Sequence, residues 1–185
     1  ATFGFSQTTY VPDDNFEQAL IDLGYDDTLD DYVLTENINS VTDLDVNSKE
    51  VSDLTGIEAF TSLIDLNVRS NQLTSIDVSN LLMLTNLNVH HNALTILDVS
   101  NNTALTHLSC SQQAGNQLTD LDISNNTALT HLDCGDNHGL TSIDVSNNTA
   151  LTRLAVYSCE ITSLDISNNA ALEELYCNEN QITSL

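Results

Sequence analysis

The sequence has very few positively charged residues. Lys49, Arg69 and Arg153 are its only lysines and arginines, against 27 aspartates and glutamates, and the formal net charge is −24 at pH 7. Such a charge repels both the phosphate backbone of nucleic acids and the anionic surface of a lipid bilayer. We therefore expect neither as a partner, whereas divalent cations, cationic partners and neutral polymers such as glycans remain open.

Long apolar runs and the familiar catalytic motifs are also missing. No stretch approaches the roughly 20 apolar residues of a membrane-spanning helix, so we expect no membrane insertion. The six glycines form no phosphate-cradling loop, and there is neither a G-x-S-x-G elbow nor an H-E-x-x-H helix. These absences predict a protein that is not an enzyme and requires no cofactor.

What the sequence does contain is an internal repeat with steps of about ten and eleven residues. Two steps make a unit of about 21 residues, within the range of leucine-rich repeats. Short insertions interrupt it at Gln113-Ala114-Gly115 and at Gly139. The equivalent apolar residues are Val41, Val51, Leu63, Leu73, Leu84, Leu94, Leu105, Leu118, Leu129, Leu140, Leu151, Ile161, Leu172 and Ile182.

Each unit consists of two similar halves. The half from Leu129 to Asn137 follows the L-x-x-L-x-L-x-x-N/C pattern, and the half from Leu118 to Asn126 is a near copy. Over residues 41–185 the chain resembles the nested 21-residue class of bacterial leucine-rich-repeat proteins. That resemblance implies a β-rich right-handed solenoid of about six coils, each with two short strand-like halves. Positions one, four and six of each half are apolar, and we expect them to face inward and to be buried by stacking of neighbouring coils.

Asparagine and cysteine occupy fixed places in this repeat. The asparagines at one turn position can satisfy backbone groups that a tight bend leaves unpaired; they are Asn71, Asn92, Asn116, Asn137 and Asn180. Cys159 takes the same slot, whereas Cys110, Cys134 and Cys177 occupy the inward sixth position. Parallel strands in register aim their Cβ atoms the same way, which is poor disulfide geometry. We therefore predict four buried thiols.

Residues 1–40 differ from the repeats and are expected to form a leader remnant followed by a helical cap. The first seven residues suggest the tail of a secretion signal, a tag scar or a short first strand. A helix should follow, with Asp14 as its N-cap and Glu17 as the capping-box partner. Its apolar stripe would consist of Phe16, Ala19, Leu20 and Leu23, with Gly24 ending the helix.

The segment from Thr9 to Glu17 resembles the cap of secreted leucine-rich-repeat proteins of the Bacteroidetes type. This resemblance implies export, often with a C-terminal sorting domain, and hence a secreted or cell-surface protein. The sequence stops inside a half-unit at Leu185. We expect that the natural protein continues beyond Leu185. The alternative is that a partner covers the last coil. An exposed last coil could also associate end to end with another copy.

The two halves of the unit differ in their outward positions. We call the half that begins at Leu63, Leu84, Leu105, Leu129, Leu151 or Leu172 the variable half, and the other the constant half. A scaffold that diversifies one face usually binds through it. The predicted binding face comprises Asp65, Asn67, Arg69, Asn86, Asn88, His90, His107, Ser109, His131, Asp133, Arg153, Tyr157, Glu174 and Tyr176.

The constant half repeats an aspartate at position five, namely Asp77, Asp98, Asp122, Asp144 and Asp165. Neighbouring carboxylates about 5 Å apart repel by just under ~1 kcal/mol per pair in water. Hydrogen bonds from turn amides or serine hydroxyls could relieve this repulsion, and so could weakly bound Ca²⁺; we favour the hydrogen bonds. The acidic run 26–31 fails the EF-hand pattern, because Asp31 stands where glycine is required, and we interpret it as a solvated turn.

Histidines and threonines form two further patterns. His107 and His131 lie at equivalent places in consecutive coils, and with His90 and Asp133 nearby they could hold a transition metal; we favour the alternative that they are two exposed histidines stacked by the repeat. The threonine columns are similar to those of ice-binding solenoids, but the neighbouring aspartates disfavour that function.

Three functions remain. We expect a non-catalytic module that recognises a protein partner through the variable face. The first alternative is a glycan-binding module in which Tyr157 and Tyr176 stack on sugar rings. The second is a passive spacer at the cell surface.

Overall fold

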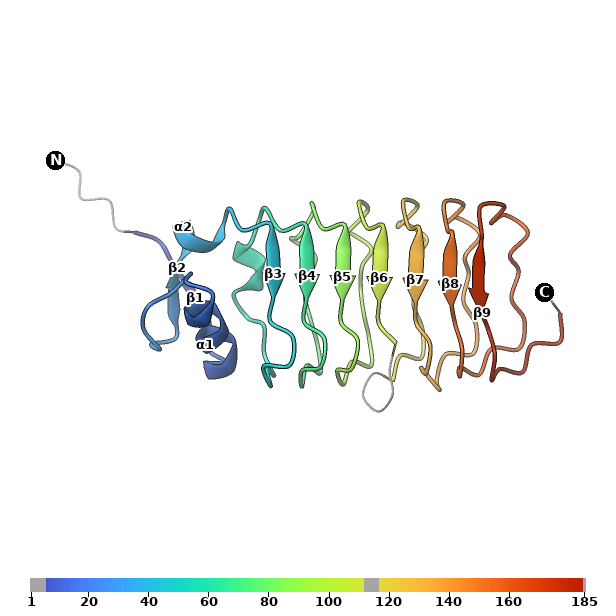
Figure 1. The fold of residues 1–185 in the computed structure, drawn as a ribbon, viewed down its shortest axis with the longest axis horizontal. Helices are drawn as coiled ribbons and strands as arrows, with labels where there is room; N and C mark the ends of the chain where they lie inside the picture. Colours follow the sequence, from blue (N-terminus) through green and yellow to red (C-terminus); the bar gives the residue numbers. More distant parts are fainter. Residues whose placement is uncertain (1–5, 112–116, 185) are drawn as a thin grey trace.

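The computed structural model describes residues 6–111 and 117–184 and shows a rod of stacked coils with a helical segment at its N-terminal end (Figure 1). Residues 1–5, the insertion at Gln113-Ala114-Gly115, the predicted ladder residue Asn116 and Leu185 lie outside the described residues. No helix in the described ranges has the length and apolar character needed to cross a membrane.

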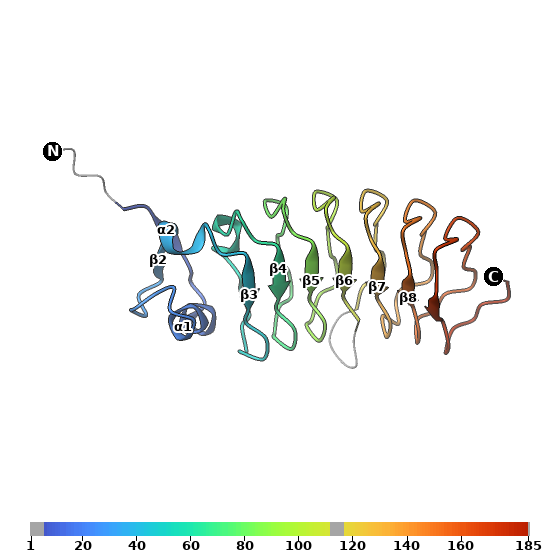
Figure 2. The ribbon, with the colours of Figure 1, turned by 45° about the horizontal axis from the view of Figure 1, so that its top comes forward.

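Seven short parallel strands form one sheet along the rod, in the order of the sequence (Figures 1 and 2). They are β3 (Asp43–Asp45), β4 (Asp65–Asn67), β5 (Asn86–Asn88), β6 (His107–Ser109), β7 (His131–Asp133), β8 (Arg153–Ala155) and β9 (Glu174–Tyr176). Each strand pairs with the next in the register that the repeat predicts, for example Leu87 opposite Leu108 and Leu108 opposite Leu132. The sequence prediction of a leucine-rich-repeat solenoid is therefore confirmed.

The core is a set of apolar columns that run along the rod. The central leucine of each strand points inward, and Leu66, Leu108 and Leu132 are at most 2% exposed. Leu118 and Leu140 of the constant half are buried as well. Because each coil is only one residue layer thick, these side chains are covered only by the coils on either side.

The two halves differ in backbone structure. All the strands of the long sheet belong to the variable half or to the coil before it, whereas in the described residues the constant half forms turns without a strand. The Asp98 and Asp144 carboxylates illustrate the reason, since each accepts a hydrogen bond from the backbone N–H of the serine two residues later. Such local bonds favour a bend over extended pairing.

The predicted asparagine column satisfies backbone groups of two coils at once. The Asn137 Oδ1 atom accepts from the Leu118 N–H, and its Nδ2 donates to the carbonyls of Cys110 and Cys134. Asn71, Asn92 and Asn180 make equivalent contacts. In the same slot, the Cys159 thiol lies 3.5 Å from the Cys134 carbonyl oxygen.

None of the four cysteines forms a disulfide. Cys110, Cys134 and Cys159 are buried, as predicted, and Cys177 in the last coil is only half-buried. Burial raises the pKa of the Cys159 thiol to about 11. Burial also raises the pKa of Cys110 and Cys134, so the three buried thiols are packing groups that remain protonated at neutral pH.

A second asparagine column, which the sequence analysis did not identify, lies in the constant half. Asn102, Asn126, Asn148 and Asn169 are all at most 4% exposed. Their Nδ2 atoms donate to two carbonyls of the preceding coil, as Asn148 does to Ile123 and Asn126. Among the described residues their Oδ1 atoms have no hydrogen-bond partner. This column therefore satisfies carbonyl groups only.

The N-terminal segment combines a two-stranded antiparallel sheet and two helices. Strands β1 (Thr8–Tyr10) and β2 (Tyr32–Leu34) pair antiparallel, helix α1 spans Asp14–Asp22, helix α2 spans Thr35–Ile38, and a 3-10 turn, η1, spans Ile57–Ala59. The predicted cap residues of α1 were wrong. The N-cap is Asp13, whose side chain accepts from the N–H groups of Asn15 and Phe16.

Glu17 has a different role from the one predicted. Its side chain is fully buried, and its Oε1 atom accepts from the N–H groups of Asp30 and Tyr32. Glu17 therefore anchors the loop before β2 and does not close a capping box. The predicted apolar stripe is right for Phe16, Ala19 and Leu20, but Leu23 is exposed, because α1 ends at Asp22.

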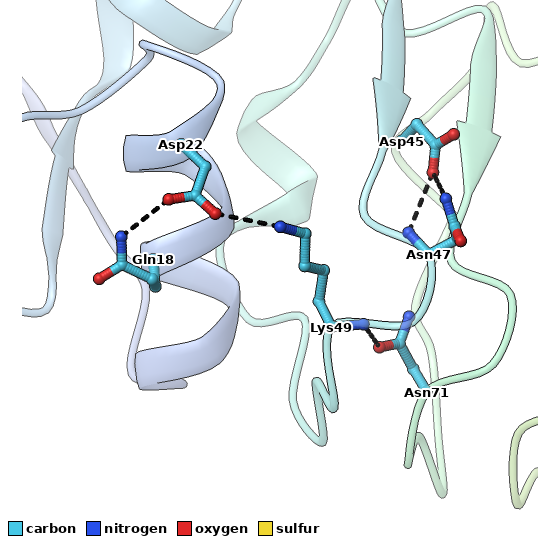
Figure 3. A network of polar contacts seen from close by, with 6 residues as sticks. All are labelled: Gln18, Asp22, Asp45, Asn47, Lys49 and Asn71. Atoms are coloured by element: carbon cyan, nitrogen blue, oxygen red, sulfur yellow. Dashed lines mark hydrogen bonds and ion pairs between the residues drawn. The ribbon is translucent and has the colours of Figure 1, made fainter.

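Helix α1 is attached to the first coil at both of its ends. At its start, the Asp13 Oδ2 atom accepts from the Ser52 N–H and hydroxyl and from the Asp53 N–H. At its end, the Lys49 Nζ atom lies 3.0 Å from Asp22 Oδ2 (Figure 3). The Lys49 N–H in turn donates to Asn71 Oδ1, so this contact continues into the asparagine column (Figure 3).

Candidate binding face

The outward side chains of strands β4–β8 form one continuous surface with a shallow pocket of about 310 Å³. We call this surface the sheet face. Within each strand the middle leucine points to the core, so the first and third residues point away from it. The sheet face therefore displays positions three and five of the variable half.

Most of the predicted binding residues line this pocket. They are Asp65, Asn67, Asn86, Asn88, His107, Ser109, His131, Asp133 and Arg153, over a floor that includes Leu87, Leu108 and Leu132. Glu174 and Tyr176 lie beyond it on β9. Arg69, His90 and Tyr157 follow their strands in the turn, and they do not line the pocket.

Two imidazole rings stack at the centre of the pocket. His107 and His131 face each other across β6 and β7, with ring centroids 4.3 Å apart and planes 14° from parallel. Each Nδ1 atom is 2.9 Å from the hydroxyl of the preceding threonine, Thr106 or Thr130. Burial and the neighbouring His131 lower the pKa of His107 below its usual value. The His107 ring is therefore uncharged at neutral pH.

Carboxylates lie on both sides of the imidazole pair. On β4, Asp65 accepts a 2.7 Å hydrogen bond from Asn86 Nδ2. On β7, Asp133 is half-buried and accepts from the Gly135 N–H at 3.3 Å. Burial raises the pKa of Asp133 despite hydrogen bonds from Gly135 and Ser111 and the charge of Arg153. The Asp133 carboxylate is thus an anion in a poorly solvated place.

At the C-terminal end of the sheet face, the one cation that lines the pocket is already engaged. Arg153 Nη1 lies 2.6 Å from Glu174 Oε2, and the guanidinium carbon is 4.8 Å from the centre of the Tyr176 ring. The Tyr176 hydroxyl donates to the same Glu174 oxygen. This exposed cluster pairs Arg153 with Glu174, so the guanidinium compensates the charge of Asp133 only in part.

The turn after the strands holds a second group of predicted residues. The His90 Nδ1 atom is hydrogen-bonded to the hydroxyl of Ser111, which is fully buried. Burial first, and then the charges of His91 and Arg69, lower the pKa of His90 to about 4. The Tyr157 ring lies against Gly135, where an added Cβ atom would come within 2.5 Å of it.

Ser111 and Gly135 were not predicted as site residues. At this turn position Ser111 is a small residue in the coil after His90, and Gly135 is a small residue in the coil before Tyr157. This alternation of small and large residues on adjacent coils is the sequence signal that could have identified them. Their packing makes Tyr157 and His90 part of the framework of this turn.

The aspartate column of the constant half is satisfied locally. The Ser79 hydroxyl and N–H hydrogen-bond the Asp77 carboxylate and lower its pKa, and the pKa values of Asp98, Asp122, Asp144 and Asp165 are lowered by the equivalent serines. These bonds agree with the favoured explanation for the column, and calcium binding there stays a prediction. Within residues 6–111 and 117–184, no three histidine, cysteine or acidic side chains are grouped so as to hold a metal ion.

The threonine column of the variable half is used within the solenoid. The hydroxyls of Thr106, Thr130 and Thr152 donate to the carbonyl of the equivalent threonine one coil earlier, at 3.0–3.1 Å. These donors reinforce strand pairing and are not displayed as a free hydroxyl array.

Comparison with known families and curated proteins gives one local match. Residues 88–110 match the model of the LVIVD repeat. No curated protein matches the sequence.

Three solved structures of similar fold are bacterial proteins. The functional domain of InlJ from Listeria monocytogenes, described as including a cysteine ladder, is 37% identical with a TM-score of 0.77, over 100% of this chain and 46% of that one. An internalin of the same species, InlF, is 28% identical with a TM-score of 0.85, over 95% and 59%. A leucine-rich-repeat protein of Leptospira interrogans is 25% identical with a TM-score of 0.72, over 82% and 40%.

The chain spans about half the length of these structures. With 21 residues between β4 and β5 and between β5 and β6, its strands follow the repeat inferred from the sequence. The coil geometry and these likenesses together identify the chain as a leucine-rich-repeat solenoid similar to the bacterial internalins.

Proposed function

We propose that this chain is a non-catalytic recognition scaffold of an exported or surface-displayed protein, and that it binds a protein partner through the sheet face. One observation carries the proposal. The repeat keeps the constant half uniform, while the variable half places chemically different side chains side by side around a pocket of about 310 Å³. The likeness to internalin solenoids supports a scaffold role.

A pair of triple variants tests the proposal. Asn88→Ala, His107→Ala and Ser109→Ala together remove side chains from the sheet face, and the matched control, Ser75→Ala, Ser142→Ala and Ser163→Ala, removes exposed side chains from the constant half. The purified chain and both variants would be applied to arrays of surface-protein ectodomains and of glycans. We expect discrete protein signals that the sheet-face variant loses and the control keeps.

Other results would point elsewhere. If the sheet-face variant keeps the protein signals, the binding surface lies elsewhere on the molecule. Binding to glycans alone, abolished by Tyr176→Ala, would favour the glycan module, for which Tyr176 is the better platform because it is 43% exposed while Tyr157 packs over Gly135. A chain with no binding in any arm would be a spacer.

A further inference from the structure

The charges of the sheet face narrow the chemistry of its partner. Asp65 and Asp133 line the pocket, and the one cation among the described residues that line it, Arg153, is paired with Glu174. Asp43 of β3 lies directly across the register from Asp65, so two carboxylates are adjacent at the N-terminal end of the face. A bound cation would relieve their mutual repulsion.

Between these anionic ends the surface suits an extended polypeptide. Asn67, Asn88 and Ser109 offer amide and hydroxyl groups that can bond to a peptide backbone, and the stacked rings of His107 and His131 give a flat surface. Hydrogen-bonding groups of this kind can bind the backbone of a peptide whatever its side chains are.

The separation of the carboxylates sets a spacing. Three strand steps of about 4.8 Å separate β4 from β7, and Asp133 lies two residues further along its strand than Asp65, so the two carboxylates should be about 16 Å apart. Four residues of extended chain cover roughly 13–14 Å and return the side chain to the same face, and a long basic side chain can span the remainder.

We propose that the sheet face binds a basic, extended segment of its protein partner, with two basic side chains four residues apart, one at Asp65 and Asp43 and the other at Asp133. This inference rests on the proposed function and adds the chemistry of the partner to it. The net charge of −24 attracts any cation to the protein, and the constant half carries an aspartate column of its own, so only a comparison at equal charge separates the two surfaces.

Acidification should weaken this binding. The titratable and charged groups around the segment are His107, His131, Asp65, Asp133, Asp43 and Arg153. Burial and the neighbouring His131 lower the pKa of His107, so its ring gains a positive charge only at a more acid pH than an ordinary histidine does. Protonation of His107 adds a like charge beneath the peptide, and protonation of Asp133 removes an attractive one.

The test uses two synthetic peptides of identical composition. In the first, two arginines stand four positions apart among glycines and serines; in the second, the arginines are adjacent. Binding to the whole chain is followed by calorimetry and by the NMR shifts of the His107 and His131 rings. We expect the spaced peptide to bind about five-fold more tightly and to shift both rings.

Variants matched in charge separate the site from general attraction. Asp65→Asn and Asp133→Asn should each weaken the spaced peptide about five-fold, whereas Asp98→Asn and Asp144→Asn, which remove the same charge from the constant half, should change affinity less than about two-fold. Circular dichroism would establish that all four variants are folded. Equal losses in all four, or equal affinity for both peptides, would overturn the proposal.

The outcome for the peptide can be told apart from the outcome for the scaffold. If the sheet-face triple variant loses its array signals but the spaced peptide does not bind, the scaffold function stands and the basic segment is wrong. If the spaced peptide binds unchanged to Asp65→Asn and Asp133→Asn while the triple variant still loses its array signals, the partner uses the sheet face but not through a basic segment.

Discussion

Asp98 of the constant half and Asp133 of the variable half both stand at position five of their half-units, and the two carboxylates behave in opposite ways. Asp98 of the constant half has its pKa lowered by hydrogen bonds from the Ser100 hydroxyl and N–H. Asp133 of the variable half has its pKa raised, because burial outweighs its hydrogen bonds. The first carboxylate is satisfied by its own turn, and the second still lacks a strong cationic partner.

This difference shows how one repeat separates stability from recognition. The inward residues of the two halves have the same role, which is to fill the core, since Leu121 and Leu132 are both buried. The outward residues differ, because the Asp-x-Ser sequence of the constant half closes hydrogen bonds within a bend, whereas the strands of the variable half use their backbone for pairing and leave side chains to the surface.

The largest expected effect tests whether the inward residues are equivalent. Leu132→Ala and Leu121→Ala should each lower the free energy of unfolding by about 2–5 kcal/mol, because each leaves a cavity in a column that neighbouring coils cannot close. Urea denaturation followed by circular dichroism measures both. A loss in one half only would show that the halves do not share the core equally.

The two asparagine columns should contribute differently to the free energy of unfolding. Asn137→Ala removes the acceptor of the Leu118 N–H and a donor to the carbonyls of Cys110 and Cys134, and it should cost about 2–3 kcal/mol. Asn148→Ala leaves only carbonyls and also removes a buried oxygen that has no partner in the described structure, so it should cost about 1–2 kcal/mol. Denaturation of both variants gives the comparison, and a larger loss for Asn148→Ala would contradict it.

Replacing Asp98 and replacing Asp133 should affect the melting temperature at pH 7 differently. Because the pKa of Asp98 is lowered in the folded state, its ionised form stabilises the fold above the unfolded pKa, and that stability is lost as the pH falls through the folded pKa. Asp98→Asn should therefore lower the melting temperature at pH 7 and have less effect at pH 3.

For Asp133 the raised pKa means that ionisation opposes folding above that pKa, and acidification removes the penalty. Asp133→Asn should leave the melting temperature at pH 7 unchanged or slightly higher, with an effect below about 1 kcal/mol. Scanning calorimetry at the two pH values measures both variants. If both lowered the melting temperature at pH 7, the contrast between the halves would fail.

The smallest expected effect concerns calcium. Because serines already bond the carboxylates of the constant half, millimolar Ca²⁺ should raise the melting temperature only modestly. Thermal melts with calcium and with a chelator check this. A large rise that the chelator reverses would show that the aspartate column is a cation site and that its local bonds are insufficient.

Much of this structure could be predicted because, in a repeat, the spacing of residues in the sequence tells where each one lies in its coil. The leucine spacing predicted the coil stacking and the direction of Leu108 and Leu132, and the variation among outward residues predicted the side chains that line the pocket. The cap was predicted less well. The predicted N-cap was one residue away from Asp13, which caps the helix through the nearby Asn15 and Phe16 N–H groups. Glu17 instead bonds to Tyr32, which is remote in sequence, so a local capping rule gave it the wrong partner.

By itself, the sequence determined the solenoid, its period and the half of each coil that varies, because these depend on which residues recur at fixed intervals. Only the tertiary structure decided that the variable half forms the sheet, and that Arg153 is paired with Glu174 while Asp133 is left in a half-buried place. The reason is that burial and charge pairing depend on neighbours from other coils, and a single repeat does not contain them.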